Sequence, residues 1–263
     1  MAIVSREASF QLTVKEVSVS FGGIKAIQDV SLGVRPGQIY SIIGPNGAGK
    51  TTLFNCISGI YHADHGSILF DGVELIGMKP HKITQLGIGR AFQNIELFKG
   101  MTVLDNLMSA RSFHMSYGLL RAAFYLGSCM AQEAQNRDLV EDVIEFLDLQ
   151  HVRKTPVMSL SYGMQKRVEL ARALAMEPKI LLVDEPVSGM NLEEREDMAR
   201  YLIDINEEKG VTVVLIEHDM GLVMDLSETV TVLNFGMKIA EGTPGEISEN
   251  PEVIKAYLGE VHT

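Results

Sequence analysis

Apolar and polar residues alternate along the first part of the chain. Apolar side chains occupy every second position in three runs, at 10–14, 17–21 and 30–34. A period of two with polar residues between predicts half-buried strands, and we expect them to pair in an antiparallel sheet. The next run, 39–43, is apolar enough to predict a strand covered on both faces.

Similar strand signals return later in the chain. Apolar runs at 180–183 and 211–216 predict further buried strands. Asp71-Gly72 lies between two short strand-like segments and predicts a hairpin turn, and a second hairpin is expected around Asn234-Phe235-Gly236.

Between about 102 and 149 the alternation disappears and a helical pattern replaces it. One stripe of this segment carries Leu139, Val143, Phe146 and Leu147. Strands interleaved with helices predict an α/β fold with a mostly parallel core, an antiparallel N-terminal sheet and an inserted helical subdomain. With 263 residues the chain can bury roughly three-quarters of its unfolded surface.

The composition narrows the range of functions. Hydrophobic residues make up 46% and charged residues 22%, which excludes a disordered or fibrous chain. A net charge of -11 opposes non-specific binding to nucleic acid. The two cysteines, Cys56 and Cys129, lie far apart without metal-type spacing, as expected in a reducing compartment.

Neither a targeting segment nor a membrane span is expected. The first eleven residues lack the basic start and apolar core of a signal peptide. The most membrane-like stretch, 112–131, has Arg121 near its middle, where a charge costs about 2.5–3.5 kcal/mol in a bilayer. We therefore interpret this stretch as helices packed in protein.

A phosphate-binding loop follows the strand at 39–43. Its residues are Gly44, Pro45, Asn46, Gly47, Ala48, Gly49, Lys50 and Thr51, and Thr52 continues into a predicted helix. Glycines let backbone N–H groups turn toward phosphate oxygens, and the helix N-terminus adds a positive dipole. Lys50 is expected to meet the β- and γ-phosphates of a nucleotide, and the Thr51 hydroxyl to ligate Mg²⁺.

Two carboxylates end the apolar run 180–183. Asp184 is placed to hold the hydration shell of Mg²⁺, and Glu185 is the candidate general base for an attacking water. Taken alone, the pair also fits an exposed acidic turn after a strand.

A further motif follows the helical segment. Ser161 is a good N-cap, and Val168, Ala171, Leu174 and Ala175 form one apolar face of the helix after it. The segment Leu160-Ser-Tyr-Gly-Met-Gln165 resembles the signature motif of ABC ATPases, about 20 residues before the two carboxylates as in that family.

This resemblance extends along nearly the whole chain. It implies a RecA-like P-loop NTPase fold in a single domain, 1–263, with a core at about 1–93 and 158–263 and a helical subdomain at about 94–157. It also implies ATP and Mg²⁺ as ligands, and a two-fold dimer in which the signature loop contacts the nucleotide of the partner.

The resemblance further assigns roles to single residues. Phe21 matches the aromatic that stacks on adenine, Gln93 the glutamine near Mg²⁺ or the water, and His218 the switch histidine. Ser161 and Gly163 match the signature contacts, and Asn191 matches the D-loop. Singly, Phe21 also fits a core aromatic, Gln93 a surface amide and His218 a strand-end hydrogen-bonding residue.

Within the family, the chain is most similar to the ATP-binding subunits of branched-chain amino-acid-type importers. Phe-Gly-Gly after 20, Ala-Phe-Gln-Asn at 91–94, the long helical insert and the ending at 250–259 carry this likeness. Alternatives are urea, amide or aromatic-acid systems, lipopolysaccharide export, and a soluble ABC ATPase without a transport role. A P-loop kinase would have no use for the signature segment.

Two residues depart from the wider family. Met164 stands where glutamine is usual, and Asn191 stands where aspartate is common. Because methionine cannot make the hydrogen bonds of an amide, we expect Met164 to change the rate modestly without abolishing activity.

The resemblance also implies partners and a location. We expect multi-span permease subunits, a homodimer or a heterodimer with a related ATPase, and indirectly a solute-binding protein, at the cytoplasmic face of the inner membrane. The apolar segments 95–98 and 101–104 are candidates to receive a permease helix; alternatively they pack inside the helical subdomain. The transported solute cannot be read from this chain, because other subunits select it.

Overall fold

Two β-sheets form the framework of the molecule in this computed structural model, which describes residues 10–91, 95–111 and 128–258. The smaller sheet is antiparallel, in the order β2-β1-β4-β5. Its strands are β1 (Leu12–Phe21), β2 (Ile24–Val34), β4 (His65–Phe70) and β5 (Val73–Glu74). The antiparallel N-terminal sheet and the Asp71-Gly72 hairpin are thus confirmed.

Strand β1 contains a bulge where the sequence suggests two separate runs. Its register against β2 shifts between Val14 and Val17, and Glu16 between them has a φ of 48°. The N–H of Glu16 donates to Ser31 Oγ at 2.8 Å. An extra residue in one strand brings the next side chains back to the same face, so Val14 and Val17 are both buried.

The larger sheet has six strands in the order β10-β9-β3-β8-β7-β6. They are β3 (Ile39–Ile43), β6 (Ile88–Ala91), β7 (Ile180–Asp184), β8 (Thr212–Ile216), β9 (Thr229–Asn234) and β10 (Met237–Gly242). Neighbours are parallel except β9 and β10, which form the expected second hairpin. Every residue of β3, β7 and β8 is buried, as predicted for strands covered on both faces.

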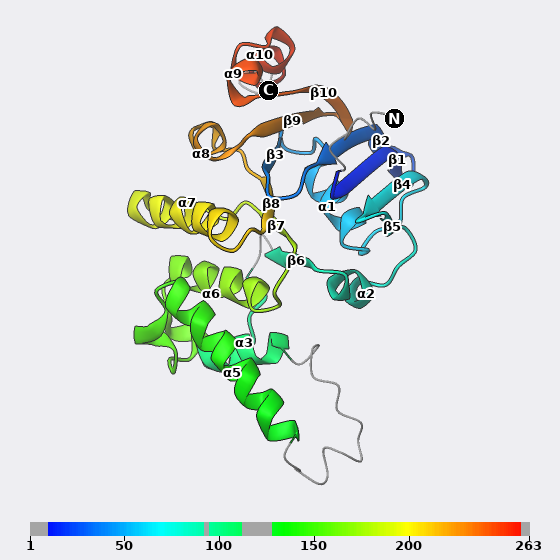
Figure 1. Ribbon diagram of the computed structural model, residues 1–263. Helices are drawn as coiled ribbons and strands as arrows, with labels where there is room; N and C mark the ends of the chain where they lie inside the picture. Colours follow the sequence, from blue (N-terminus) through cyan, green and yellow to red (C-terminus); the bar gives the residue numbers. More distant parts are fainter. Residues whose placement is uncertain (1–9, 92–94, 112–127, 259–263) are drawn as a thin grey trace, which may run out of the picture.

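Helices cover both faces of the larger sheet (Figure 1). Helix α1 (Lys50–Ile57) lies between the two sheets, and Leu53 and Phe54 join the apolar core there. On the other face, α6 (Tyr162–Leu174) and α7 (Leu192–Glu207) bury their apolar sides. The other described helices are α2 (Pro80–Gln85), α3 (Val103–Arg111), α5 (Ser128–Phe146), α8 (Met220–Leu226), α9 (Pro244–Ser248) and α10 (Pro251–Leu258), with single 3-10 turns at Gln150–Val152 and Val157–Ser159.

The helical region consists of α3 and α5, which pack on each other and on α6. On its inner face Val140, Ile144 and Leu147 are buried. The other members of the predicted stripe, Leu139, Val143 and Phe146, are half-buried. The stripe is therefore displaced by about one residue, because the positions of α3 and α6 decide which side of α5 is covered. The boundaries 94 and 157 remain predictions.

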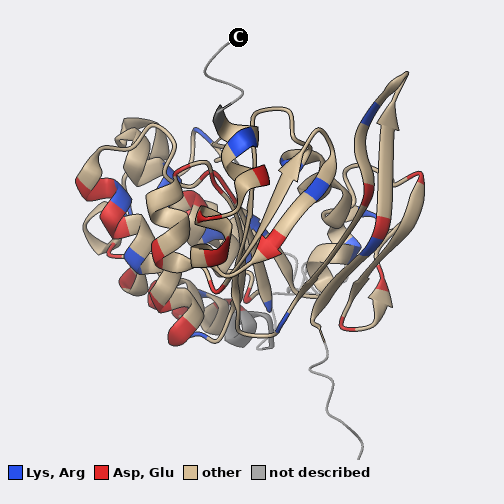
Figure 2. Cartoon of the chain, turned by 90° about the horizontal axis from the view of Figure 1, so that it is seen from above, with Lys and Arg blue, Asp and Glu red and all other residues tan. Residues whose placement is uncertain are grey.

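The segment 112–131 lies mostly outside the described residues, and only its end, from 128, belongs to α5. Of the helices within the described ranges, none has both the length and the hydropathy needed to cross a bilayer. Figure 2 shows acidic residues on helices and strands alike, with basic residues between them.

Candidate functional site

The phosphate-binding loop lies at the C-terminal end of β3, a central strand with β8 on one side and β9 on the other. Helix α1 starts at Lys50 with Gly49 as its N-cap, at a φ of 99°. The loop therefore presents a helix N-terminus at the edge of a buried sheet, where an anion is favoured.

Backbone contacts fix the shape of the loop at two glycines. Gly44 has a φ of 145°, and a Cβ there would lie 2.0 Å from the carbonyl oxygen of Leu233. A Cβ on Gly49 would lie 2.5 Å from the carbonyl oxygen of Ala26. Because backbone oxygens cannot move away as flexible side chains do, glycine is required at both positions.

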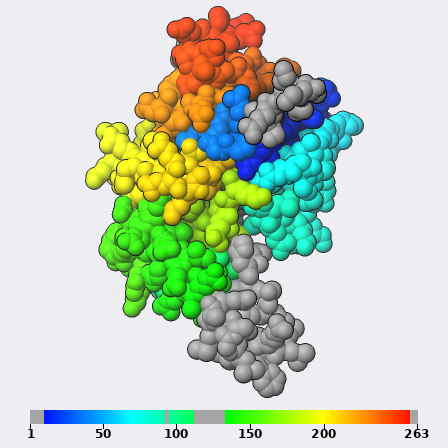
Figure 3. Space-filling view, in the orientation of Figure 1, coloured from blue at the N-terminus to red at the C-terminus, as the bar shows by residue number. Residues whose placement is uncertain are grey.

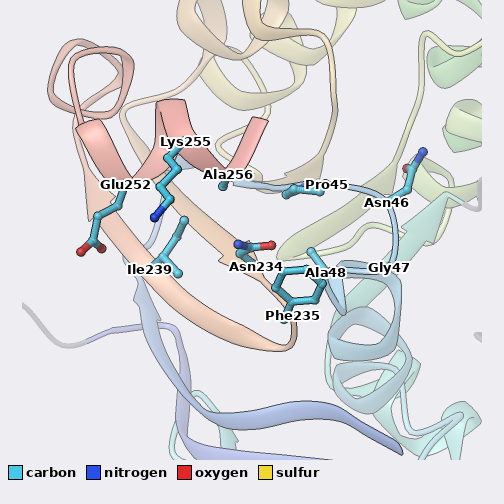
Figure 4. A pocket seen from close by; sticks show the side chains of 10 residues that line it. All are labelled: Pro45, Asn46, Gly47, Ala48, Asn234, Phe235, Ile239, Glu252, Lys255 and Ala256. Carbon is cyan, nitrogen blue, oxygen red and sulfur yellow. The ribbon is translucent and has the colours of Figure 1, made fainter. Parts of the chain in front are cut away.

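Two hollows adjoin this loop. One, of about 310 Å³, is lined by the loop together with Lys50, Thr51, Thr52 and Glu185. The other, of about 760 Å³, lies on the other side of the loop, between Pro45–Ala48, the β9–β10 turn and α10 (Figure 4). The first hollow brings Lys50, Thr51 and Glu185 together, three of the residues expected to act on a nucleotide, and we call it the phosphate hollow.

Lys50 is buried and its ammonium group stays beside the loop. Nζ donates to the carbonyl oxygens of Gly44 at 2.6 Å and Pro45 at 3.0 Å. The backbone carbonyls at the helix start thus hold the ammonium group where phosphate oxygens would lie.

Asp184 ends β7 and is almost fully buried, with 1% of its side chain exposed. Its Oδ2 lies 3.5 Å from Nη2 of Arg90 on the adjacent strand β6. Within the described ranges no donor gives a hydrogen bond to either carboxylate oxygen. Burial raises the pKa of Asp184, and the Arg90 guanidinium opposes this shift.

Glu185 and His218 face each other across adjacent strand ends. Glu185 has a φ of 48°, and its N–H donates to the Ile216 carbonyl at 2.9 Å. This left-handed conformation is uncommon for a non-glycine residue. It accompanies a change of direction after β7, and the side chain of Glu185 lines the phosphate hollow. Its Oε1 lies 3.8 Å from Nδ1 of His218.

A buried glutamate, Glu217, connects the two loops that carry Glu185 and His218. Glu217 follows β8 and accepts the N–H groups of Val187 at 3.4 Å, His218 at 2.9 Å and Asp219 at 3.2 Å. Burial raises the pKa of Glu217, while the hydrogen bonds from His218 and Val187 oppose the shift. The residue therefore ties the loop after β7 to the loop after β8.

The signature segment packs against the start of α7. Ser161 caps α6 as predicted, with its Oγ accepting the Met164 N–H at 3.3 Å. A Cβ on Gly163 would lie 2.3 Å from Oε1 of Glu194. Glu194 in turn forms a reciprocal capping box with Asn191. Ser161, Gly163 and Asn191 are not among the described residues that line the phosphate hollow.

The remaining expected site residues have different outcomes. The Phe21 side chain is 47% exposed at the end of β1 and meets Tyr61 edge-on, with ring centroids 5.0 Å apart. It is therefore not a core aromatic, although it does not line the phosphate hollow. Gln93 lies outside the described residues. The roles of all these residues remain proposals.

Sequence reasoning missed two charged residues of the site, Arg90 and Glu217. Each carried a signal, because a charged side chain within or directly after a short buried strand needs a partner. Arg90 interrupts the apolar strand β6, and Glu217 ends the apolar run of β8 just before His218.

The chain matches two known families. Residues 27–188 match the family described as ABC transporter, and residues 237–263 match the family described as branched-chain amino acid ATP-binding cassette transporter. The chain belongs to the ABC transporter family.

Relatives within this family cover almost the full chain. It is 42% identical over 249 residues to the high-affinity branched-chain amino acid transport ATP-binding protein BraF of Pseudomonas aeruginosa, covering 95% of this chain and 98% of BraF. It is 38% identical to the corresponding protein LivG of Escherichia coli K12, with the same coverage.

Solved structures of ATP-binding cassettes share the fold. The ADP conformation of a cassette of an ABC transporter superposes with a TM-score of 0.82 at 30% identity, covering 95% of this chain and 99% of that one. A dimeric cassette in a post-hydrolysis state with ADP and phosphate has a TM-score of 0.74 at 26% identity, covering 89% and 98%. The predicted P-loop NTPase fold of the ABC ATPases is confirmed.

Proposed function

We propose that this chain is the ATP-hydrolysing subunit of an importer for branched-chain or similar amino acids. The observation that carries the ATPase part is the phosphate hollow, where the P-loop, Lys50, Thr51 and Glu185 line one cavity of about 310 Å³. The ABC family membership and the ADP-bound neighbour support ATP as the nucleotide.

The residues expected to bind the metal fit a magnesium-bound nucleotide. Asp184 is buried, and within the described part of the chain its oxygens accept no hydrogen bond, so water molecules around a cation would supply the missing donors. Thr51, whose hydroxyl is the second expected metal contact, lines the phosphate hollow, and Gln93 is the third. Bound Mg²⁺ would neutralise charge on the β- and γ-phosphates.

Glu185 acts as the base in this proposal. Its carboxylate lines the hollow, accepts a proton from the attacking water and positions that water for in-line attack. His218 Nδ1 lies 3.8 Å from Glu185 Oε1, and its role in this proposal is to contact the γ-phosphate. Lys50 and the loop N–H groups stabilise the charge that develops on the transferred phosphoryl group.

A second cassette completes each site. Ser161 and Gly163 lie at the start of α6, away from the phosphate hollow of their own chain, and the helix N-terminus there suits an anion. We infer that they contact the nucleotide held by a partner, and that Asn191 lies at the same interface. The dimeric cassette among the structural neighbours supports this arrangement.

A groove between the core and the helical region suits a membrane partner. It encloses about 480 Å³ and is lined by Ser58, Ile60, Pro80, Thr84, Arg90, Phe98, Ser109, Ala110, Arg172, Ala173 and Met176. Phe98 is 52% exposed and Met101 nearby is 42% exposed, while Leu97 and Val103 are buried. In Figure 3 the cyan surface and the yellow-green surface of α6 meet in this region.

We propose that the groove receives a short helix of a permease at the cytoplasmic face of the membrane. In segments 95–98 and 101–104, Leu97 and Val103 pack inside the molecule, while Phe98 and Met101 stay accessible to the proposed helix. Nucleotide-driven closing and opening of two cassettes would then move the permease. The solute class rests on the names of the relatives.

Mixed dimers test the shared site. Lys50→Ala removes the cation that is expected to contact the phosphates, and Ser161→Arg places a large side chain in the signature loop. Each variant alone should therefore hydrolyse ATP poorly. In a mixed dimer, the P-loop of the Ser161→Arg copy meets the intact signature loop of the other copy, which restores one site. Activity that returns on mixing supports the proposal, and continued inactivity of two folded variants would reject it.

Affinity purification from detergent-solubilised membranes of the native host tests the transport role. Multi-span permeases and a second ATPase or a second copy are expected with the chain. Recovery of soluble factors or ribosomes in their place would favour the soluble ABC ATPase alternative.

A further inference from the structure

Arg90 is a buried charged residue that the chemistry above does not use. It lies in β6, beside β7, and 8% of its side chain is exposed. Burial lowers the pKa of the guanidinium, and Asp184 opposes that shift. Burying a charge is costly unless well-placed partners surround it. The contacts of Arg90 therefore indicate its role.

One side of the guanidinium is attached to α1. Nη1 donates to Asn55 Oδ1 at 2.8 Å and to Ser58 Oγ at 3.1 Å, and the group lies 5.9 Å from the centre of the Phe54 ring. Helix α1 begins at the phosphate-binding loop. Arg90 is thereby fixed to the element that positions Lys50 and Thr51.

The other side of the guanidinium faces the metal-binding carboxylate. Nη2 lies 3.5 Å from Asp184 Oδ2, close enough for charge attraction but longer than a charge-assisted hydrogen bond. Both Asp184 oxygens therefore keep their acceptor capacity as far as the described residues go. Such an arrangement holds a carboxylate in place without occupying the lone pairs that a hydrated cation needs.

We propose that Arg90 is a positioning residue that orients Asp184 for magnesium-bound nucleotide by linking it to α1. This inference rests on the proposed ATPase function and extends it to a residue outside the phosphate hollow. Partners that orient metal ligands typically change metal affinity or activity 10–100-fold when they are removed. Lysine cannot replace the arrangement fully, because its single nitrogen cannot reach both Asn55 and Ser58 on one side and Asp184 on the other, as the two separate nitrogens of the guanidinium do.

The test compares Arg90→Ala, Arg90→Lys and Asn55→Ala with the wild type. The first readout is the Mg²⁺ concentration that gives half-maximal hydrolysis. The second needs no turnover: the affinity for a fluorescent ATP analogue with Mg²⁺ and in EDTA. We expect Arg90→Ala to raise the Mg²⁺ concentration for half-maximal hydrolysis about 10–100-fold. The affinity for the ATP analogue in EDTA should change much less. Arg90→Lys should restore part of the loss, and Asn55→Ala should give a smaller shift in the same direction.

Arg111 provides a matched control for the loss of a buried arginine. It is as buried as Arg90 but lies among the helices, donating to Asn136 Oδ1 at 2.9 Å and the Ala175 carbonyl at 2.9 Å. An equal Mg²⁺ shift in Arg111→Ala would overturn the proposal, since general loosening of the fold would then explain both. An unchanged Mg²⁺ dependence in Arg90→Lys and Asn55→Ala would overturn it even if Arg90→Ala failed to fold. A wild type that binds no Mg-ATP would instead reject the proposed function itself.

Discussion

The phosphate hollow and the groove between core and helical region are built in different ways. Backbone makes most of the hollow, because glycines, loop carbonyls and a helix N-terminus fix its shape. Side chains from α2, α3, α6, β6 and the segment after α1 make the groove, and Phe98 among them is half exposed. The difference suits the proposed roles, in which an edge built from backbone holds the reacting groups and a side-chain surface receives a partner.

Removing the base from the hollow should have the largest effect. Glu185→Gln keeps the shape of the side chain but cannot accept the proton of the attacking water, so we expect hydrolysis to fall about 10²–10⁴-fold. ATP should still bind, and a dimer should persist on a sizing column in Mg-ATP. Glu207→Gln, at the exposed end of α7, serves as a control that removes one carboxylate elsewhere. Near-normal turnover of Glu185→Gln would remove Glu185 as the base.

Two glycines of the same loop should differ sharply in their tolerance of a methyl group. Gly44→Ala forces a Cβ against the Leu233 carbonyl, so we expect loss of more than about 3 kcal/mol in the free energy of unfolding. Gly47 has a φ of 78° but open space around it, so Gly47→Ala should cost only about 1–2 kcal/mol of backbone strain. Urea unfolding of both variants measures the difference, and equal losses would show that backbone contact does not shape the hollow.

A charge in the groove should affect recognition and leave the hollow intact. Phe98→Glu removes an exposed apolar anchor worth about 1.5–3 kcal/mol when buried by a partner, or roughly tenfold or more in affinity. Stability of the isolated chain should change by less than about 0.5 kcal/mol. Retention of the permease subunits during purification and basal ATP hydrolysis are the two measurements. A parallel fall in both would contradict the separation of the two regions.

The smallest expected effect is a pH dependence from Glu217 behind the hollow. Its pKa is raised by burial, so ionised Glu217 destabilises the folded state above that pKa, and lowering the pH through it relieves the cost. The gain in stability of Glu217→Gln over the wild type should therefore be largest near pH 8 and shrink as the pH falls toward 5. Thermal unfolding across this range checks the sign, and an advantage that grows as the pH falls would contradict it.

The same contrast explains what the sequence could predict. Glycine spacing after a buried strand identifies the P-loop, because the positive φ angles of the loop occur at its glycines and are visible as glycine in the sequence. To predict the Arg90–Asp184 pair, one must know that β6 and β7 are neighbours, although the 88 residues 92–179 lie between them in the sequence. The groove likewise combines three helices, α2, α3 and α6, with the segment after α1 and with Arg90 of β6. The bulge at Glu16 and the displaced stripe on α5 depend on pairing partners, which local patterns do not specify.

The contact of Gly163 with Glu194 has a consequence for natural variation. The carboxylate of Glu194 accepts the N–H of Asn191 at 3.2 Å and occupies the space that a side chain at 163 would fill. Any larger residue at 163 would displace this carboxylate and remove its hydrogen bond with the Asn191 N–H, which leaves only the Asn191 side chain to cap α7. Positions 163, 191 and 194 should therefore vary together among related chains, with a side chain at 163 found where α7 begins with a different cap.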